Sequence, residues 1–407
     1  MNVLVVFFFV ALGLVLGLVL AALAVSQRHG HLMGGSRLLP SRFMSWLAAR
    51  FEAWSRVTSR KMTPASTRLL TLSHGHIVSQ CIFSVVKLGI ADAMERDPRP
   101  AAAIAEELEL HEDTVARLLR LLAAHGCFEA VGLSEHMYRH NSVSVLLRRD
   151  HPRSLCSTML MLAESYPAWA RTAETVETGE RVYPKFTGGI SFRNATFPAV
   201  GEGGKPRKGH HLLRAAEVDR YRLSEGALLA DYRWSQHHRL LDMGGGPGRL
   251  LSAVLRSNAM MGGVLWVRPD GIESTKAWWQ RFVEDLGDRL KFVVGETVAA
   301  LPAVGAGDAL LLSFVLGTLE DTAAVAHLSS LRHEVGAARV TLIVADMVLD
   351  ERESNHAKLL LDAQARGLGP IRHRTRTDWT ALLQLGGFQV DKIVRCRGRA
   401  SLILASP

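Results

Sequence analysis

The feature that most constrains the fold is an alternation of strand-like and helix-like segments that begins near residue 238. Short apolar runs are typical of buried strands, and here each is followed by a stretch with helical spacing. The runs are RLLDM (239–243), GVLWV (263–267), KFVVG (291–295), ALLLSFVL (309–316) and RVTLIVADM (339–347). Near the end, FQVDKIVRC and ASLILAS are separated only by residues 397–399, which predicts a closing antiparallel pair. This order predicts an α/β fold with a largely parallel sheet, helices on both faces, and ligands beyond the carboxyl ends of the strands.

The turn after the first strand, in LDMGGGPGRL at residues 241–250, is rich in glycine. Asp242 ends the strand, and Gly244, Gly246 and Gly248 let the backbone turn tightly and approach a ligand. A dinucleotide site has the spacing GxGxxG and seats a pyrophosphate on the following helix. Here the spacing is GxGxG and an acid precedes it, which favours a ligand with a cationic amino group and a sulfonium. The turn therefore predicts S-adenosylmethionine, and a dinucleotide is the alternative.

The segment from residue 66 to residue 230 is mostly helical in pattern and contains AIAEELELHEDTVARLLRLLAAHGCFEAV at residues 103–131. A short helix, a turn, a second helix and a stop at Gly126 predict a helix-turn-helix, and the next segment is suited to form a wing. Glu112 and Asp113 at the start of the second helix would repel the phosphates of DNA. We therefore predict a winged helix used for packing and dimerisation, and we expect no nucleic-acid partner.

The composition fits a folded chain with two cores, because 407 residues with 48% apolar and 21% charged side chains can bury enough surface. Four cysteines, Cys81, Cys127, Cys156 and Cys396, lie far apart and form no CxxC pair. This spacing indicates neither a zinc site nor a disulfide framework. We therefore expect no metal.

An uncharged stretch, VLVVFFFVALGLVLGLVLAALAV at residues 3–25, lies near the amino terminus. As a helix its 23 residues reach about 34 Å, enough to cross the hydrocarbon core of a bilayer. Between Ser26 and Lys61 there are seven Arg or Lys residues and one Glu, a net charge of +6. This pattern predicts an uncleaved single-pass membrane anchor with the rest of the chain in the cytosol. A cleaved signal peptide that ends near Ala22–Ala24 is the alternative.

The segment SRFMSWLAARFEAWSRV at residues 41–57 predicts a basic helix with aromatic side chains, suited to a headgroup layer. A helix docked on the globular body is the alternative for this segment. The predicted organisation is a transmembrane anchor at residues 1–27, a basic amphipathic juxtamembrane segment at 28–65, a helical winged-helix dimerisation domain at 66–230, and a ligand-binding α/β domain at 231–407.

From about residue 70 to the carboxyl terminus, the chain resembles the plant-type and acetylserotonin-type O-methyltransferases. The stretches that match, in the family's order and spacing, are LGIADAM, ARLLRLLAAHGCFE, RLLDMGGGPGRLL, ALLLSFVLGTLED, TLIVADMVLDE and RTRTDWTALLQLGGF. The resemblance implies a class I methyltransferase with a Rossmann-like sheet, a winged-helix homodimer and S-adenosylmethionine as the methyl donor. It also implies an enzyme that methylates a small apolar or aromatic acceptor, which the predicted anchor would place at a membrane surface.

The resemblance also implies a set of donor-binding residues. They are Asp242, Gly244, Gly246, Gly248, Glu296 and Ser313, with the amino-acid end of the donor at the first three. Glu296 matches an Asp on the adenine side, and Ser313 stands where many plant members have a Lys. In the family the second strand ends in an acid that binds the ribose hydroxyls, whereas this chain has Val267 there. Asp270 is the candidate substitute, and an exposed turn residue is the alternative reading.

The largest departure from the family concerns the base. Family members carry LHDW after the fourth strand, and that His takes the proton from the acceptor hydroxyl. This chain reads LGTL, with Gly317 at the position of the His. A placed base contributes about 10²- to 10⁴-fold to the rate of such a transfer. The usual mechanism therefore cannot operate at position 317.

Two carboxylates flank that His in the family, and they are matched here by Asp346 and, within PIRHRT, by His373. We therefore hypothesise that Asp346 orients His373 as a relocated base. The alternative is that His373 is a solvated loop residue and that the acceptor is already nucleophilic, as a thiolate, thioether, carboxylate or acidic phenol is. A further alternative is a catalytically silent relative that serves as a binding and dimerisation protein.

Overall fold

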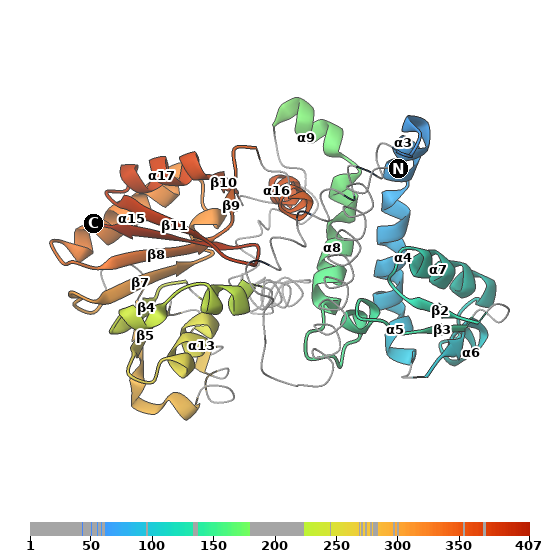
Figure 1. The fold of residues 1–407 in the computed structure, drawn as a ribbon, viewed down its shortest axis with the longest axis horizontal. Coiled ribbons are helices and arrows are strands. Elements are labelled where there is room, and N and C mark those ends of the chain that lie inside the picture. Colours follow the sequence, from blue (N-terminus) through green and yellow to red (C-terminus); the bar gives the residue numbers. More distant parts are fainter. Residues whose placement is uncertain are drawn as a thin grey trace, which may run out of the picture. The chain divides into compact units, whose positions relative to one another are not determined.

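The computed structural model describes most of the chain beyond residue 61 (Figure 1). The described residues are 62–94, 97–132, 137–179, 224–244, 246–267, 284–295, 301–352, 355–368 and 372–407, with single positions at 43, 50, 55, 58, 269, 272, 275, 276, 279 and 298. They form two compact units, one of Met1–Cys81 and Ile90–Leu146 and the other of Ile82–Gly89 and Leu147–Pro407. The predicted anchor at 1–27 lies outside the described residues. So does the segment predicted at 28–65, except for positions 43, 50, 55, 58 and 62–65.

The amino-terminal elements include the helix-turn-helix that the sequence predicts. The elements are α3 (Ala65–Ser73), α4 (Gly75–Leu88), α5 (Ile90–Ala93), β1 (Arg99–Pro100), α6 (Ala101–Glu107), α7 (Glu112–Ala124), β2 (Glu129–Val131), β3 (Met137–Arg139) and the 3-10 turn η1 (Ser144–Leu147). Helix α7 buries Val115, Leu119 and Leu122, and it ends before Gly126, whose φ is +72°. Strands β2 and β3 pair antiparallel as the wing, and β1 pairs with the other side of β3.

One helical stretch within the described residues, Ala65–Leu88, has the length and apolar composition of a membrane span. It corresponds to α3 and α4, and 11% of its most apolar 18-residue segment is buried. Its exposed large apolar side chains include Leu69, Leu70, Leu72 and Ile77. A dimerisation helix also leaves its apolar face open in a single chain, so length and composition do not identify a membrane segment here.

The second unit contains the predicted α/β sheet. Its strands are β4 (Arg239–Asp242), β5 (Gly262–Val267), β6 (Leu290–Val294), β7 (Asp308–Ser313), β8 (Thr341–Asp346), β11 (Gln389–Arg395) and β12 (Ser401–Ser406). The order in the sheet is β11-β12-β8-β7-β4-β5-β6, and the five strands from β8 to β6 are parallel. Strand β12 pairs antiparallel with both β8 and β11, as the closing pair was predicted to do. A separate parallel pair joins β9 (Val348–Leu349) to β10 (Arg374–Thr375).

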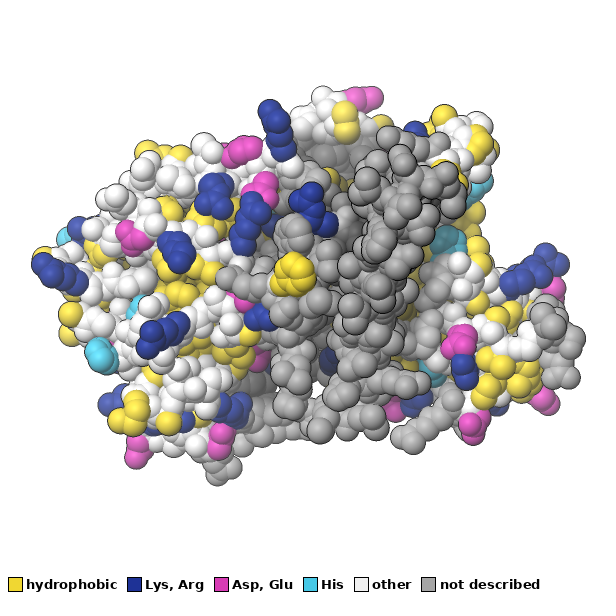
Figure 2. Space-filling model, viewed as in Figure 1, with side chains coloured by type: hydrophobic (Ala, Val, Ile, Leu, Met, Phe, Trp, Pro, Cys, Tyr) yellow, Lys and Arg dark blue, Asp and Glu magenta, His cyan; other side chains and the backbone are white. Residues whose placement is uncertain are grey.

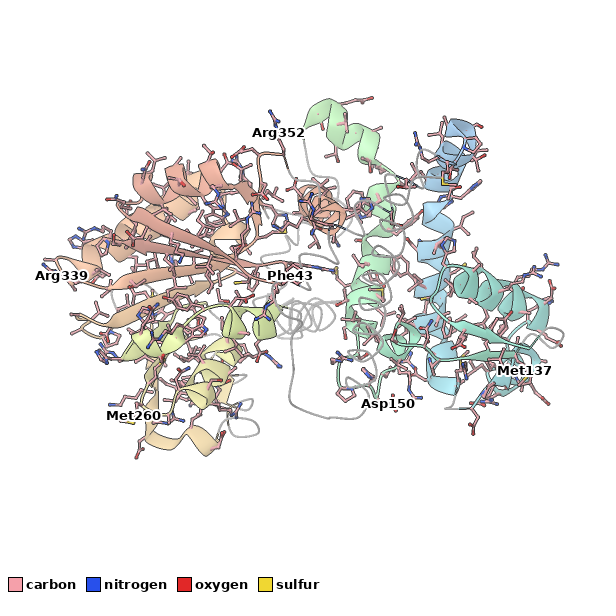
Figure 3. The ribbon with its side chains drawn as sticks, viewed as in Figure 1. Phe43, Met137, Asp150, Met260, Arg339 and Arg352 are labelled. Atoms are coloured by element: carbon pink, nitrogen blue, oxygen red, sulfur yellow. The ribbon has the colours of Figure 1, made fainter. Side chains whose placement is uncertain are left out.

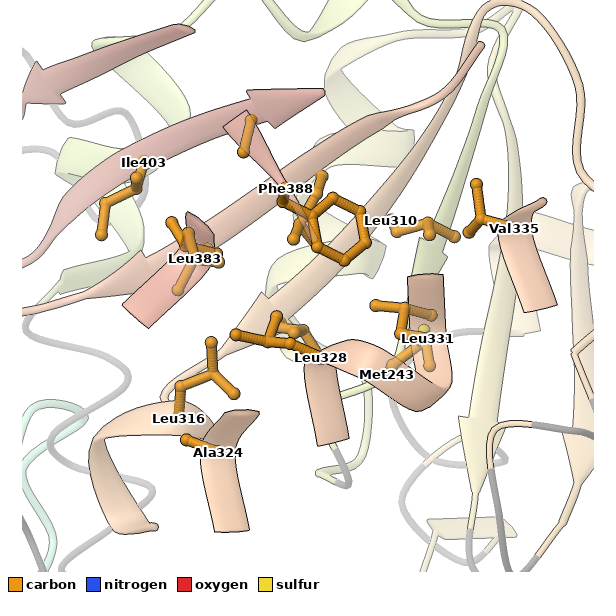
Figure 4. Close-up of a cluster of buried hydrophobic side chains, with 14 of the residues drawn as sticks. Met243, Leu310, Leu316, Ala324, Leu328, Leu331, Val335, Leu383, Phe388 and Ile403 are labelled. Atoms are coloured by element: carbon orange, nitrogen blue, oxygen red, sulfur yellow. The ribbon is translucent and has the colours of Figure 1, made fainter. Parts of the chain in front are cut away.

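Helices cover both faces of this sheet (Figure 1). The helices on its faces are α13 (Arg249–Ser257), α15 (Asp321–Val335) and α17 (Arg376–Leu385). Further helices of the described residues are α8 (Cys156–Trp169), α9 (Thr172–Thr178) and α16 (His356–Leu368), and the 3-10 turns are η2 (Trp234–Gln236), η4 (Glu284–Arg289) and η6 (Leu316–Thr318). Leu328 and Leu331 of α15 and Leu383 of α17 belong to one buried cluster with Leu310 of β7 on one face (Figure 4). Helix α13 fills the core on the other face, and α16 packs against α8.

The amino ends of the parallel strands can be followed in Figure 3. Met260 precedes β5 and Arg339 precedes β8, so these two labelled side chains mark that edge of the sheet. The carboxyl ends of β4, β7 and β8 lie at the opposite edge, where the sequence analysis places the candidate site. On the face drawn in Figure 2, the Arg and Lys side chains of the described residues are interspersed with hydrophobic and acidic ones.

Candidate active site

The site begins where β4 ends in a buried acid. Asp242 is 5% exposed, and its Oδ1 accepts a hydrogen bond of 2.9 Å from the backbone N–H of Gly244. A Cβ added to Gly244 would lie 3.0 Å from that oxygen and 3.2 Å from the carbonyl oxygen of Ser313 at the end of β7. Glycine at this position therefore lets the two strand ends approach without a tight side-chain contact. The structure thus brings together three of the residues that the sequence analysis selected.

The rest of the turn combines a tight contact with an open space. Gly248 has a φ of +71° and a Cβ there would lie 3.0 Å from Leu265, so this position also requires glycine. From Gly248 the chain enters α13. A Cβ added to Gly246, in contrast, would have no heavy atom of the described residues within 4 Å. The turn therefore leaves room beside Gly246 for a ligand to approach the backbone.

The carboxyl group of Asp242 lies in an environment that favours its neutral form. Burial raises the pKa of Asp242 from 3.8 to about 6, and the hydrogen bond from the N–H of Gly244 acts in the opposite direction. A cation bound beside this carboxylate would supply the missing counter-charge and lower the pKa again. The electrostatics of the turn thus suit a positively charged ligand.

At the end of β8, Asp346 lies directly against Gly317. Asp346 is 4% exposed, its Oδ2 accepts a hydrogen bond of 3.0 Å from the N–H of Gly317, and its Oδ1 accepts one of 2.8 Å from the N–H of Met347. A Cβ added to Gly317 would lie 2.8 Å from Oδ2 and 2.9 Å from Oδ1. The carboxylate therefore occupies the space that any side chain at position 317 would need.

This geometry makes a stability prediction for Gly317→Ala. Because the new methyl group would displace Asp346 from two backbone hydrogen bonds, we expect a loss of about 2 kcal/mol in the free energy of unfolding. Urea denaturation of the variant measures this loss. Gly305→Ala is the matched control, since a Cβ at Gly305 meets nothing within 4 Å. Equal stabilities of the two variants would contradict the prediction.

His373 lies on a segment that is bonded to the same turn. The N–H of Arg372 donates to the carbonyl oxygen of Gly317 at 2.8 Å. Arg374, which is 1% exposed, donates to the carbonyl oxygens of Leu316 and Leu319, each at 2.8 Å. The backbone on either side of His373 is therefore held against the turn that carries Gly317.

The carboxylate of Asp362 on α16 lies near His373, with Nδ1 and Oδ1 3.5 Å apart, which is longer than a usual hydrogen bond. Burial raises the pKa of Asp362. The pairing of Asp346 with His373 stays a prediction. Asp362 was not singled out in the sequence, because nothing in its spacing shows that α16 would carry it to this loop.

Other predicted residues divide between the described and the undescribed parts of the chain. Glu296 and Asp270 lie outside the described residues, so their roles stay predictions. Val267 is 1% exposed at the end of β5, where the family has its ribose-binding acid. Within the described residues, no cluster of His, Cys, Asp and Glu is suited to hold a metal ion.

A parallel sheet of this order with an acid and a glycine turn after its first strand defines a class I methyltransferase fold. The O-methyltransferase dimerisation domain matches residues 70–150, and the O-methyltransferase domain matches residues 169–389. The second match alone covers more than half of the 407 residues. The chain therefore belongs to the O-methyltransferase family, whose members use S-adenosylmethionine.

Individual relatives show the same likeness along most of the chain. Phenazine O-methyltransferase of Lysobacter antibioticus is 28% identical over 346 residues, which are 84% of this chain and 97% of the relative. Phenazine-1-carboxylate N-methyltransferase of Pseudomonas aeruginosa is 27% identical over 347 residues, with 84% and 97% covered. The crystal structure of LaPhzM matches with a TM-score of 0.71 at 26% identity, over 85% of this chain and 100% of that one.

Proposed function

We propose that this chain transfers the methyl group of S-adenosylmethionine to a heteroatom of a small aromatic acceptor. The observation that carries the donor half is the buried Asp242 carboxylate beside Gly244 and the open space at Gly246. A buried carboxylate needs a cationic partner, and the amino group of the donor supplies one. The proposed donor-binding residues are Asp242, Gly244, Gly246, Gly248, Glu296 and Ser313.

The acceptor half of the proposal follows from the contact between Gly317 and Asp346. Because position 317 has no side chain to accept a proton, we expect an acceptor whose nucleophile needs no base. A ring nitrogen and an ionised phenol are examples. The nitrogen lone pair forms the new N–C bond while the C–S bond breaks, which leaves a neutral thioether and a positive charge on nitrogen. The likeness to a phenazine-1-carboxylate N-methyltransferase supports an acceptor of this kind.

For an acceptor that must lose a proton, we propose His373 as the base. The residue before it, Arg372, is bonded to Gly317, and Oδ1 of Asp362 lies 3.5 Å from Nδ1 of its ring, within reach of an orienting hydrogen bond after a small shift. The oriented imidazole would take the proton of the acceptor as the methyl group transfers. Asp346 remains the second candidate for orienting His373, as the sequence hypothesis has it.

The proposal is tested with the full-length protein, S-adenosylmethionine and matched aromatic acceptors. We expect turnover of a phenazine with a free ring nitrogen and of an acidic phenol, and slow turnover of a phenol that stays protonated at pH 7. Formation of S-adenosylhomocysteine measures the rates. Absence of product with every acceptor class, together with no binding of the donor, would contradict the proposal and favour a silent binding protein.

His373→Ala separates the two kinds of acceptor. We expect the variant to methylate the ring nitrogen at the rate of the unmodified protein and to lose about 10²-fold or more on a hydroxyl acceptor. Asp362→Asn tests the orienting role, because a smaller loss on the hydroxyl acceptor alone is expected. Equal losses on both acceptors would show that His373 acts through structure and not as a base.

We also propose that the predicted anchor at residues 1–27 holds the protein on a membrane, with the catalytic unit in the cytosol and a homodimer formed through the winged helix. The support is the uncharged length of residues 3–25 and the +6 charge between Ser26 and Lys61. Resistance of the expressed full-length protein to extraction by alkaline carbonate tests the anchor. Complete release into the soluble fraction would contradict it.

A further inference from the structure

A tryptophan from outside the glycine turn is bonded directly to it. The indole Nε1 of Trp279 donates a hydrogen bond of 2.9 Å to the carbonyl oxygen of Pro247. Pro247 lies between Gly246 and Gly248, within the turn proposed to hold the donor. A hydrogen bond to the main chain at this place fixes the orientation of one peptide unit of the turn.

The indole is in turn held by the edge of the sheet. Its ring lies against Phe292 of β6, with the ring centroids 3.7 Å apart and the planes inclined by 46°. Trp279 also packs against the core on the α13 face. A continuous series of contacts thus runs from β6 through Trp279 to the turn. Its position is therefore determined independently of any ligand.

The residue at the end of β5 makes the shape of the glycine turn important for donor binding. Val267 stands there in place of an acid, so a donor bound in the site has no carboxylate at that position to accept its ribose hydroxyls. Its affinity then depends more on a turn that already has the binding shape, because a preformed site loses less conformational freedom when the ligand binds. We propose that Trp279 is a positioning residue for S-adenosylmethionine, because it holds the turn in its donor-binding shape. This inference rests on the proposed function.

The test compares two substitutions of the same kind. Trp279→Phe keeps an aromatic ring against Phe292 and removes the N–H that Pro247 accepts. Trp234→Phe is the matched control, because Nε1 of Trp234 donates at 3.1 Å to the carbonyl oxygen of Leu228, before β4 begins. Calorimetric titration with S-adenosylhomocysteine gives the dissociation constant for each full-length variant, and thermal unfolding gives its stability.

We expect Trp279→Phe to raise the dissociation constant about fivefold, the factor that corresponds to one hydrogen bond, and to leave the KM for the acceptor unchanged. Trp234→Phe is expected to lower the unfolding temperature about as much as Trp279→Phe does, because it also removes one hydrogen bond, but to leave the dissociation constant unchanged. Binding by Trp279→Phe as tight as that of the unmodified protein would overturn the role of Trp279 alone. No binding by the unmodified protein would overturn the proposed function and this role with it.

Discussion

Asp242→Asn is expected to weaken donor binding about a hundredfold at pH 8. The substitution keeps an oxygen to accept the N–H of Gly244 and removes only the charge. Loss of one partner from a buried, hydrogen-bonded charge pair costs about 2 to 5 kcal/mol, and about 2.7 kcal/mol corresponds to a factor of 100. Calorimetric titration with S-adenosylhomocysteine measures the change.

The same carboxylate makes donor binding depend on pH. In the folded chain without donor, burial raises the pKa of Asp242 to about 6, so the folded state holds this proton more tightly than the unfolded chain does. Its contribution to stability is therefore complete below about pH 4, and about 3 kcal/mol of it is lost as the pH rises to about 6. The donor binds the ionised form, so its affinity is expected to rise through pH 6 and to level off above about pH 7.

The control for both effects is Asp391→Asn, which removes a charge from the exposed edge strand β11. This variant is expected to bind the donor like the unmodified protein at every pH. Asp242→Asn is expected to bind weakly between pH 5 and pH 8 with little dependence on pH. A steep pH dependence in Asp242→Asn would assign the titrating group to another residue.

Arg374→Met is expected to lower the free energy of unfolding by about 3 kcal/mol. The guanidinium of Arg374 is buried, donates to the carbonyl oxygens of Leu316 and Leu319, and forms an ion pair with Asp321 at 2.8 Å. It also lies over the ring of Trp379, with Cζ 5.2 Å from the centroid. Methionine fills similar space but leaves buried carbonyl groups without this donor, at about 1 to 3 kcal/mol each.

Chemical denaturation measures this loss against Arg376→Met. Arg376 is an exposed residue at the start of α17, and its replacement is expected to change stability by less than about 0.5 kcal/mol. Arg374→Lys is expected to retain only a part of the stability that Arg374→Met loses. An ammonium group cannot reproduce the planar set of donors that binds Leu316, Leu319 and Asp321. Equal stabilities of Arg374→Met and Arg376→Met would exclude the role described for this side chain.

The fold was predictable because its signals are local. The runs at 239–243 and 339–347 are apolar enough to be buried on both sides, and glycine after Asp242 marks a tight turn whatever surrounds it. The structure confirms the parallel order and the closing antiparallel pair. The donor turn could be located for the same reason, since acid and glycines lie within seven residues of one another.

The base side of the site was less accessible from the sequence because it depends on distant segments. Asp362 reaches His373 only through the packing of α16, and no spacing along the chain records that contact. Arg374 looks like one charge among several in RHRTR, and only its burial against the turn at Leu316 reveals its role. A charged residue is seldom buried, so sequence reasoning places such a residue in solvent by default.

The contact between Gly317 and Asp346 has a consequence for how the protein can change over generations. A histidine introduced at position 317 would meet the carboxylate at once, while a shorter residue at 346 would first strand the amides of Gly317 and Met347. Relatives hold a His and a carboxylate side by side at these two positions, so regaining the His here also requires a shift of the Asp346 carboxylate. Positions 317 and 346 are therefore expected to change together over generations, because a side chain at the first needs space that the carboxylate at the second now fills.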